Sequence, residues 1–169
     1  LFGRAEYVQK SAEELVLPPR LDTPEARTAA LQQVAVTLAA EGALTAWRDE
    51  LYAVRTAFAA PALLYVERAA ARYFGIRTYA AHGNGLVAGN AAQRDGVLST
   101  RMWLARRSPT KAISPSLLDN LVGGGIARDE SPAATLRREA FEEAGIEGVD
   151  IDAPLATLTV ERAVADGYQ

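Results

Sequence analysis

The sequence has no cysteine and a single histidine, His82, and both scarcities exclude classes of site. Without cysteine there is no disulfide, no thiolate zinc site and no cysteine nucleophile. One histidine cannot build a metal site from several imidazoles. The lack of cysteine suits a reducing compartment and no signal peptide is visible, so a cytoplasmic location is predicted.

Long apolar runs and a strong excess of charge are also absent. No apolar segment approaches the ~20 residues of a membrane span, so no membrane partner is expected. The formal net charge of −3 argues against a nucleic-acid partner, which usually requires a basic face. A small phosphorylated substrate remains compatible with this charge, because bound Mg²⁺ can supply the positive charge.

Near residue 76, alanine-rich helical patterns give way to strand-like patterns, which predicts two regions. Residues 1–76 are expected to be mostly helical. Thr23 followed by Pro24 is typical of a helix start, and Gly42 of its end. A second helix is predicted over 61–73, and a short strand over 47–54.

Residues 77–169 are predicted to form a mixed α/β domain. The sequence predicts a helix that begins at Ser131-Pro132 and ends at Gly145. Alternation and turn signals predict the other elements: extended segments at 78–87, 97–107, 121–122 and 155–162, a turn at 90–96, and a loop at 111–120.

Both chain ends indicate a piece of a longer protein. The chain begins with Leu1 rather than methionine, and it stops shortly after Asp166-Gly167, a hairpin signal. A missing second hairpin arm predicts that the domain is incomplete at its C-terminus. A mass spectrum of the parent protein that matches these 169 residues alone would contradict this prediction.

The most informative stretch is residues 124–146, with the sequence GGIARDESPAATLRREAFEEAGI. On a helix, Glu142 and Glu143 lie at about −60° and +40° from Glu139, so three carboxylates share an arc of about 100°. Crowded carboxylates repel one another unless cations bind them, and carboxylate oxygens are the ligands that Mg²⁺ prefers. The opposite side of this helix, which only Arg137 interrupts, is apolar and is predicted to pack on a sheet: Ala133, Ala140, Phe141 and Ala144.

The glycines and one arginine complete the pattern. Three glycines, 123–125, allow the backbone to turn tightly before the helix and to approach metal or phosphate closely. Arg138 can pair with Glu130 and fix the loop against the helix. Taken alone, an acidic helix face is usually solvated and a glycine triplet is usually a turn. The full pattern has seven fixed positions: Gly124, Glu130, Arg138, Glu139, Glu142, Glu143 and Gly145. Together they match by chance on the order of 10⁻⁸ per start position.

This stretch resembles the box that is the signature of the Nudix hydrolases, with Ala140 where the family usually has a bulky aliphatic residue. The resemblance implies an α/β/α sandwich with a mixed central sheet. It also implies hydrolysis of a diphosphate bond in a nucleoside diphosphate derivative or a similar small molecule. The implied cofactor is Mg²⁺, with Mn²⁺ as an alternative.

The resemblance also implies roles for the residues of the box. Arg138 and Glu130 would orient the site, and Gly124 and Gly125 would approach phosphate. A water would attack phosphorus, with Glu139 as the expected base unless the base lies in a later loop, as in some members. The implied metal ligands are the carbonyl of Gly123 and the side chains of Glu139, Glu142 and Glu143.

A wider likeness covers much of the remaining chain and resembles a Nudix subgroup related by name to thiamine pyrophosphokinase. Yeast and plant members are associated with metabolite repair, in which oxythiamine or oxothiamine diphosphate is hydrolysed to a monophosphate. A thiamine diphosphate analogue is therefore the leading substrate. The segments that carry the likeness keep the subgroup's order: Trp47–Val54, Val66–Ala70, Phe74-Gly75, His82–Gly85, Ala105–Ser108 with Lys111, and Leu118–Asn120.

Several alternatives stay open. Arg106, Arg107 and Lys111 are candidates for binding phosphate, although solvent-facing charges explain them equally well. Trp103 could stack on a ring, but core packing is favoured. Instead of a thiamine analogue, the substrate could be an oxidised nucleoside triphosphate or a nucleotide sugar. The chain could also be a non-catalytic sensor, which the intact glutamates disfavour, or an inactive fragment with an N-terminal interaction module. Many Nudix enzymes are homodimers, so a homodimer is possible, although nothing in the sequence requires one.

Overall fold

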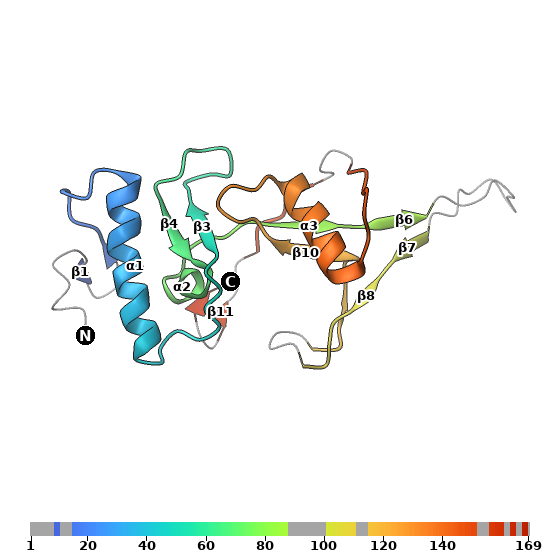
Figure 1. The fold of residues 1–169 in the computed structure, drawn as a ribbon, viewed down its shortest axis with the longest axis horizontal. Coiled ribbons are helices and arrows are strands. Elements are labelled where there is room, and N and C mark those ends of the chain that lie inside the picture. The colour runs from blue at the N-terminus through green and yellow to red at the C-terminus, as the bar shows by residue number, and fades with distance from the viewer. Residues whose placement is uncertain are drawn as a thin grey trace, which may run out of the picture. The chain divides into compact units, whose positions relative to one another are not determined.

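A computed structural model of the chain describes residues 9–10, 15–87, 101–110, 115–151, 156–160, 163–164 and 167–168. The chain divides into two compact units (Figure 1). Unit 1 contains the chain up to Tyr79, the short stretch Ala127–Asp129 and the C-terminal residues from 154 onwards. Unit 2 contains Ala80–Ile126 and Glu130–Ala153. The proposed boundary near residue 76 between an extension and a hydrolase domain stays a prediction.

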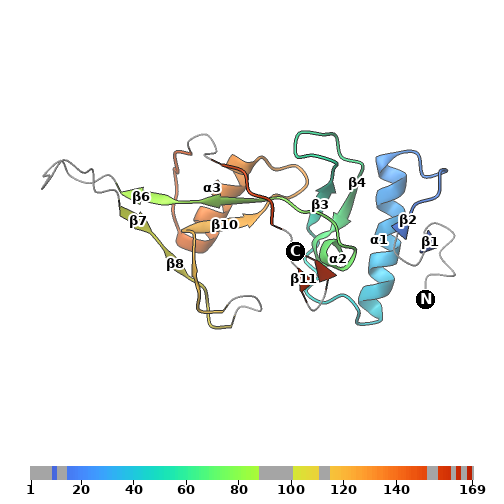
Figure 2. The same cartoon turned by 180° about the vertical axis from the view of Figure 1, so that it is seen from behind.

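The described residues of unit 1 form one long helix, one short helix and antiparallel strand pairs. β1 pairs with β2, β3 with β4, and β11 with β12. The long helix α1 lies along β4 in both views (Figures 1 and 2). The elements of unit 1 are β1 (Gln9–Lys10), β2 (Leu15–Val16), α1 (Pro24–Ala40), β3 (Leu51–Val54), β4 (Leu64–Glu67), α2 (Arg68–Tyr73), β11 (Ala163–Val164) and β12 (Gly167–Tyr168).

The first predicted helix is confirmed by α1. The hydroxyl of Thr23 accepts a hydrogen bond from the Ala26 N–H at 3.2 Å, and Pro24 occupies the first turn. Gly42 follows the helix with a φ of 76°, a left-handed conformation that glycine adopts without a steric penalty. The buried face of α1 packs on the β3–β4 pair and forms the core of unit 1 with Leu31, Val34, Ala35, Leu38, Tyr52, Leu64 and Val66.

The second predicted helix is wrong in its first half, because residues 64–67 form strand β4. Leu64 and Val66 are only 6% and 1% exposed, and they alternate with the less buried Tyr65. Pairing with β3 and cover from α1 bury both side chains, so packing outweighs the helical composition of this stretch. The N-terminal region is therefore less helical than predicted.

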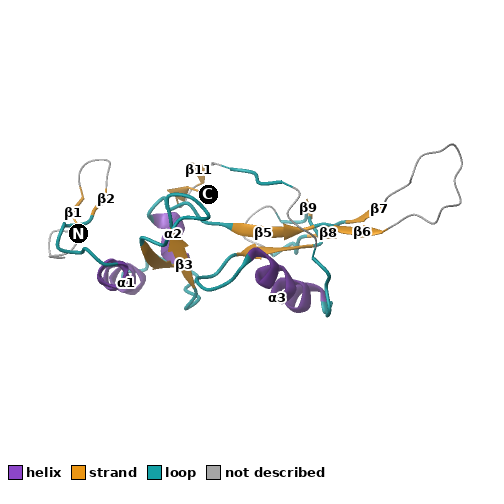
Figure 3. Ribbon diagram, turned by 90° about the horizontal axis from the view of Figure 1, so that it is seen from above, coloured by secondary structure: helices purple, strands orange, loops and turns teal. Residues whose placement is uncertain are grey.

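The described residues of unit 2 form one helix and three antiparallel strand pairs. β5 pairs with β10, β6 with β7, and β8 with β9. Helix α3 lies against one side of the β5–β10 pair (Figure 3). The combination of a helix with strands agrees with the predicted α/β character. Every strand pair among the described residues is antiparallel, so the mixed central sheet of a sandwich stays a prediction. The elements are β5 (Ala80–Gly83), β6 (Gly85–Val87), β7 (Arg101–Trp103), β8 (Ala105–Arg106), β9 (Leu118–Asp119), β10 (Val122–Gly125) and α3 (Pro132–Ala144).

Several local predictions for unit 2 are corrected. The glycines 123–125 lie in strand β10 instead of a turn, and residues 118–119 of the predicted loop form β9. Residues 156–160 form no strand, although alternation predicted one. The predicted turn at 90–96 lies outside the described residues.

Packing differs from the prediction at two large apolar side chains. Trp103 is 63% exposed, so core packing is the wrong interpretation of this residue in the described part of the chain. Phe141 is 58% exposed, whereas Ala140 on the same helix is buried. Among the described elements, α3 packs on β5 and β10, and this packing buries Ala140 but leaves Phe141 exposed.

No helix among the described residues is long and apolar enough to cross a membrane.

Candidate functional site

The acidic helix α3 begins and ends where the sequence predicts. The Ser131 hydroxyl accepts a hydrogen bond from the Ala134 N–H at 3.1 Å, and Pro132 occupies the first turn. Gly145 ends the helix with a φ of 64°, in the left-handed region. These signals define the helix that carries the box glutamates.

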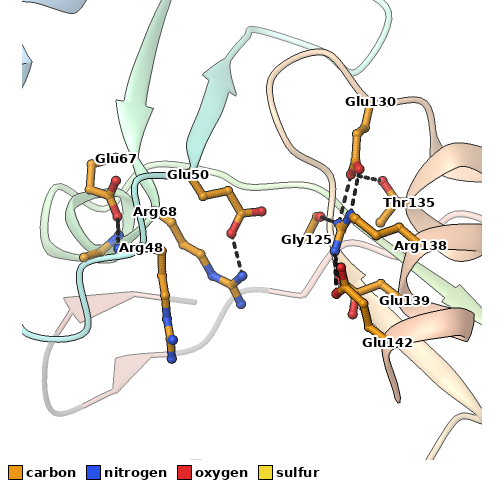
Figure 4. A network of polar contacts seen from close by, with 11 residues as sticks. Arg48, Glu50, Glu67, Arg68, Gly125, Glu130, Thr135, Arg138, Glu139 and Glu142 are labelled. Atoms are coloured by element: carbon orange, nitrogen blue, oxygen red, sulfur yellow. Dashed lines mark hydrogen bonds and ion pairs between the residues drawn. The ribbon is translucent and has the colours of Figure 1, made fainter. Parts of the chain in front are cut away.

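Arg138 is the centre of the polar network on this helix (Figure 4). Its guanidinium binds both carboxylate oxygens of Glu130, from Nε at 2.7 Å and from Nη2 at 2.9 Å. Its Nη1 donates to Glu139 at 2.8 Å and to Glu142 at 3.2 Å. The hydrogen bonds to Glu130, followed by those to Glu139, raise the pKa of Arg138 above its ordinary value. Arg138 therefore remains charged and joins the end of the box loop to the acidic helix face.

A second donor fixes the position of Glu130. The Thr135 hydroxyl donates to Oε2 of Glu130 at 2.9 Å. Thr135 is completely buried on the inner side of α3. The predicted contact between Arg138 and Glu130 is thus present, and Thr135 is a member of the network that sequence reasoning missed. Its place one helical turn before Arg138 was the available signal.

Glu139 lies directly on the backbone of β10. A methyl group built at Gly124 would overlap the Glu139 carboxyl group. On the other face of the strand, a methyl group at Gly123 would lie 2.5 Å from Nδ1 of His82, its partner across the β5–β10 ladder. The glycines are therefore required by side chains that press on β10 from both faces, and the sequence did not indicate this role for His82.

The side chains of α3 offer the type of ligand atom that a divalent metal ion prefers. Glu139, Glu142 and Glu143 supply hard carboxylate oxygens within two turns of one helix, and Glu139 already lies beside the glycine strand. In the described part of the chain, no three acidic or histidine side chains converge on one point. Glu139 and Glu142 are instead turned toward Arg138 (Figure 4), so metal ligation at Gly123 and the three glutamates stays a prediction.

The predicted phosphate-binding arginines lie in the β8–β9 hairpin. Nη1 of Arg107 forms an ion pair with Asp119 at 2.6 Å, and Nη1 of Arg106 donates to the Ser116 carbonyl at 2.8 Å. Both guanidinium groups therefore have partners within the hairpin, and a role in binding phosphate stays a prediction. Lys111 lies outside the described residues.

Comparison with known protein families gives one match in each half of the chain. Residues 90–168 match the NUDIX domain. The chain carries a Nudix domain. Residues 5–78 match a domain of unknown function, DUF4743.

Named relatives agree with this identification. Over 148 residues, or 88% of this chain, it is 41% identical to Nudix hydrolase 24, chloroplastic, and 39% identical to Nudix hydrolase 20, chloroplastic, both from Arabidopsis thaliana. A Nudix hydrolase from Deinococcus radiodurans is 41% identical over 63 residues, which are 35% of each chain. The chain spans only 39% and 38% of the two plant relatives. Their names place those two proteins in the chloroplast, so a cytoplasmic location for this chain stays a prediction.

One prediction concerns the contact between Gly124 and Glu139 in the Nudix domain. We expect Gly124→Ala to lower turnover about tenfold or more, because the added methyl group displaces the Glu139 carboxylate by about an ångström. The measurement is turnover per folded molecule, together with the free energy of unfolding. Gly83→Ala on β5 is the matched control, because the nearest atoms to its methyl group belong to Val122 of β10 and Leu136 of α3, not to a box glutamate. Equal turnover losses in the two variants would contradict this prediction.

A second prediction concerns the stability of the β8–β9 hairpin in acid. The hydrogen bond from Arg107 lowers the pKa of Asp119 below its ordinary value of 3.8. The ion pair therefore adds stability that is fully present above about pH 4 and is lost as the pH falls through the lowered pKa. We expect Asp119→Asn to reduce the loss of unfolding free energy between pH 6 and pH 2, measured by urea titration. Asp150→Asn, at an exposed aspartate of the same unit, should follow the parent protein. An Asp119→Asn curve parallel to the parent would contradict this assignment.

Proposed function

We propose that this chain forms part of a Mg²⁺-dependent hydrolase that cleaves a diphosphate bond in a small organic molecule. The observation that carries the proposal is the position of Glu139, whose carboxylate lies on the glycine strand β10 beside two further box glutamates. A closely approaching backbone and several hard oxygens suit a substrate that carries phosphate together with a divalent cation. Glu142 and Glu143 would complete the ligand set, with the carbonyl of Gly123.

Each residue of the site has a role in this reaction. Bound Mg²⁺ would supply positive charge to offset that of the diphosphate and of the transition state. Glu139 would accept a proton from the attacking water while the new O–P bond forms and the bridging P–O bond breaks. The displaced phosphate would leave with the bridging oxygen. Arg138 and Glu130 would orient the helix and the loop, and Gly124 and Gly125 would let the phosphates approach β10.

The substrate proposed within this class is a thiamine diphosphate analogue such as oxythiamine diphosphate. The likeness of the N-terminal segments to the thiamine-related Nudix subgroup supports this choice. The match of residues 5–78 to a domain separate from the Nudix domain is compatible with a subgroup defined by an N-terminal extension. The exposed indole of Trp103 on β7 offers a face for stacking on a heteroaromatic ring. Arg106, Arg107 and Lys111 would meet the phosphates.

Phosphate release by the full-length parent protein with Mg²⁺ tests both levels of this proposal. The panel consists of thiamine diphosphate, oxythiamine diphosphate, oxidised nucleoside triphosphates, a nucleotide sugar and ADP-ribose. A preference for oxythiamine diphosphate supports the substrate, and a preference for a nucleotide keeps the hydrolase but overturns the thiamine assignment. If metal binds but no compound of the panel releases phosphate, the proposal is overturned in favour of a ligand sensor.

A further inference from the structure

The loop between β10 and α3 has its tip in unit 1. Residues Ala127–Asp129 belong to that unit, together with the β3–β4 hairpin. The Arg128 N–H donates a hydrogen bond to the Leu51 carbonyl at 2.8 Å. The Arg128 guanidinium carbon lies 4.1 Å from the centre of the Tyr65 ring, which is the distance of a cation–π contact. The tip of the box loop is therefore held by its backbone and by its side chain.

The two anchoring residues are themselves well fixed. Leu51 and Tyr65 lie on paired strands, where Leu51 faces Glu67 and Tyr65 faces Ala53. The Tyr65 N–H also donates to the Thr28 hydroxyl of α1 at 2.9 Å. Contacts to paired strands constrain a loop more than contacts to another loop, because hydrogen-bonded strands move and open less than loops do.

The held tip is adjacent in sequence to the polar network of the site. Glu130 follows Arg128 by two residues and accepts both hydrogen bonds from the bidentate Arg138 guanidinium. Arg138 in turn holds Glu139, the carboxylate on the glycine strand. Only one residue, Asp129, separates the anchored Arg128 from Glu130 along the chain.

We infer that the β3–β4 hairpin, within the stretch that matches the domain of unknown function, takes part in the reaction by positioning the Nudix box loop. Tyr65 and Arg128 are positioning residues that act through Glu130 and Arg138. Neither residue belongs to the proposed metal ligands or to the proposed base. This inference rests on the proposed hydrolase function, so its test includes a measurement that does not depend on turnover.

The test uses Arg128→Gln, Tyr65→Leu, Tyr65→Phe and the double variant Arg128→Gln/Tyr65→Leu in the full-length protein. We expect Arg128→Gln and Tyr65→Leu each to lower kcat about fivefold with little change in KM, because the loss of one cation–π contact is of that size. The double variant should be no worse than the more severe single variant, since both changes remove the same contact. Tyr65→Phe keeps the aromatic face and should retain the parent kcat.

Hydrogen exchange at the Arg128 amide gives the readout that is independent of activity. Exchange should become faster in Tyr65→Leu and stay at the parent rate in Tyr65→Phe, because the ring holds the loop. Arg55→Gln is the matched control, since Arg55 is an arginine of unit 1 whose Nη1 donates to the Phe58 carbonyl at 3.0 Å, and it should change neither measurement.

The outcomes separate the two proposals. If the parent protein hydrolyses no diphosphate, the proposed function fails, while the exchange rates still report whether the hairpin holds the loop. If exchange at Arg128 is the same in Tyr65→Leu and the parent, the anchor is overturned. Additive losses of kcat, or a loss in Tyr65→Phe equal to that in Tyr65→Leu, would also overturn it, because the aromatic contact would then not be the cause.

Discussion

Glu143→Gln is expected to lower turnover at least about 100-fold and to leave the free energy of unfolding nearly unchanged. The substitution removes a ligand charge but almost no volume, and Glu143 lies on the exposed side of α3. The loss should therefore appear in kcat and in the Mg²⁺ concentration needed for half-maximal activity. Both quantities come from phosphate-release assays across a Mg²⁺ series, with unfolding followed by urea titration.

The control for this experiment is a glutamate outside the box helix. Glu147→Gln removes the same charge at an exposed position just beyond the end of α3, so it should behave as the parent protein does. Unchanged turnover in Glu143→Gln would contradict the assignment of the metal ligands. An equal loss in Glu147→Gln would mean that net charge, not ligation, is responsible.

Arg138→Gln should produce the largest combined effect on stability and activity. The guanidinium bridges Glu130, Glu139 and Glu142, and without it these carboxylates repel one another with no compensating cation. We expect the free energy of unfolding to fall by roughly 2 kcal/mol, the range for lost charged hydrogen bonds. A buried ion pair would cost more, but the Arg138 and Glu130 side chains are 33% and 23% exposed. Turnover should fall more than about tenfold, because the Glu139 carboxylate loses the partner that orients it.

The neighbouring arginine provides the matched control for Arg138→Gln. Arg137 lies on the exposed side of the same helix, so Arg137→Gln changes the same charge and helix propensity without touching the network. Urea unfolding of the two variants with and without Mg²⁺ separates the effects. If both variants are equally stable, the Arg138 network does not contribute to the fold. If Mg²⁺ restores much of the stability of Arg138→Gln, carboxylate repulsion is the cause of the loss.

Local signals in the sequence were sufficient for helices α1 and α3 and for one contact of the site. Thr23-Pro24 and Ser131-Pro132 predicted the starts of α1 and α3, because N-caps and first-turn prolines act within a few residues. The pairing of Arg138 with Glu130 followed from the spacing of the box. These features depend on neighbours in the sequence and need no knowledge of the rest of the fold.

Long-range packing could not be predicted from the same signals. Residues 64–67 stand in an alanine- and leucine-rich stretch that predicted a helix, and pairing with β3 and packing against α1 accompany the strand observed there. The register between β5 and β10, which places His82 against Gly123, depends on pairing across about forty residues of chain. The exposure of Trp103 likewise depends on which elements cover β7, and its aromatic character gave no indication of that.

Strand β10 separates a carboxylate on one face from an imidazole on the other by the thickness of a single peptide chain. The two glycines differ in how they could change during evolution. An alanine at position 123 could be accommodated if the exposed His82 were exchanged for a smaller residue on β5, and the acidic helix would be unaffected. An alanine at position 124 would displace the Glu139 carboxylate unless a shorter residue replaced Glu139, and either change alters the acidic face of the helix. Replacement of glycine by alanine is therefore compatible with an intact acidic helix on the face of β10 that meets His82, but not on the face that meets Glu139.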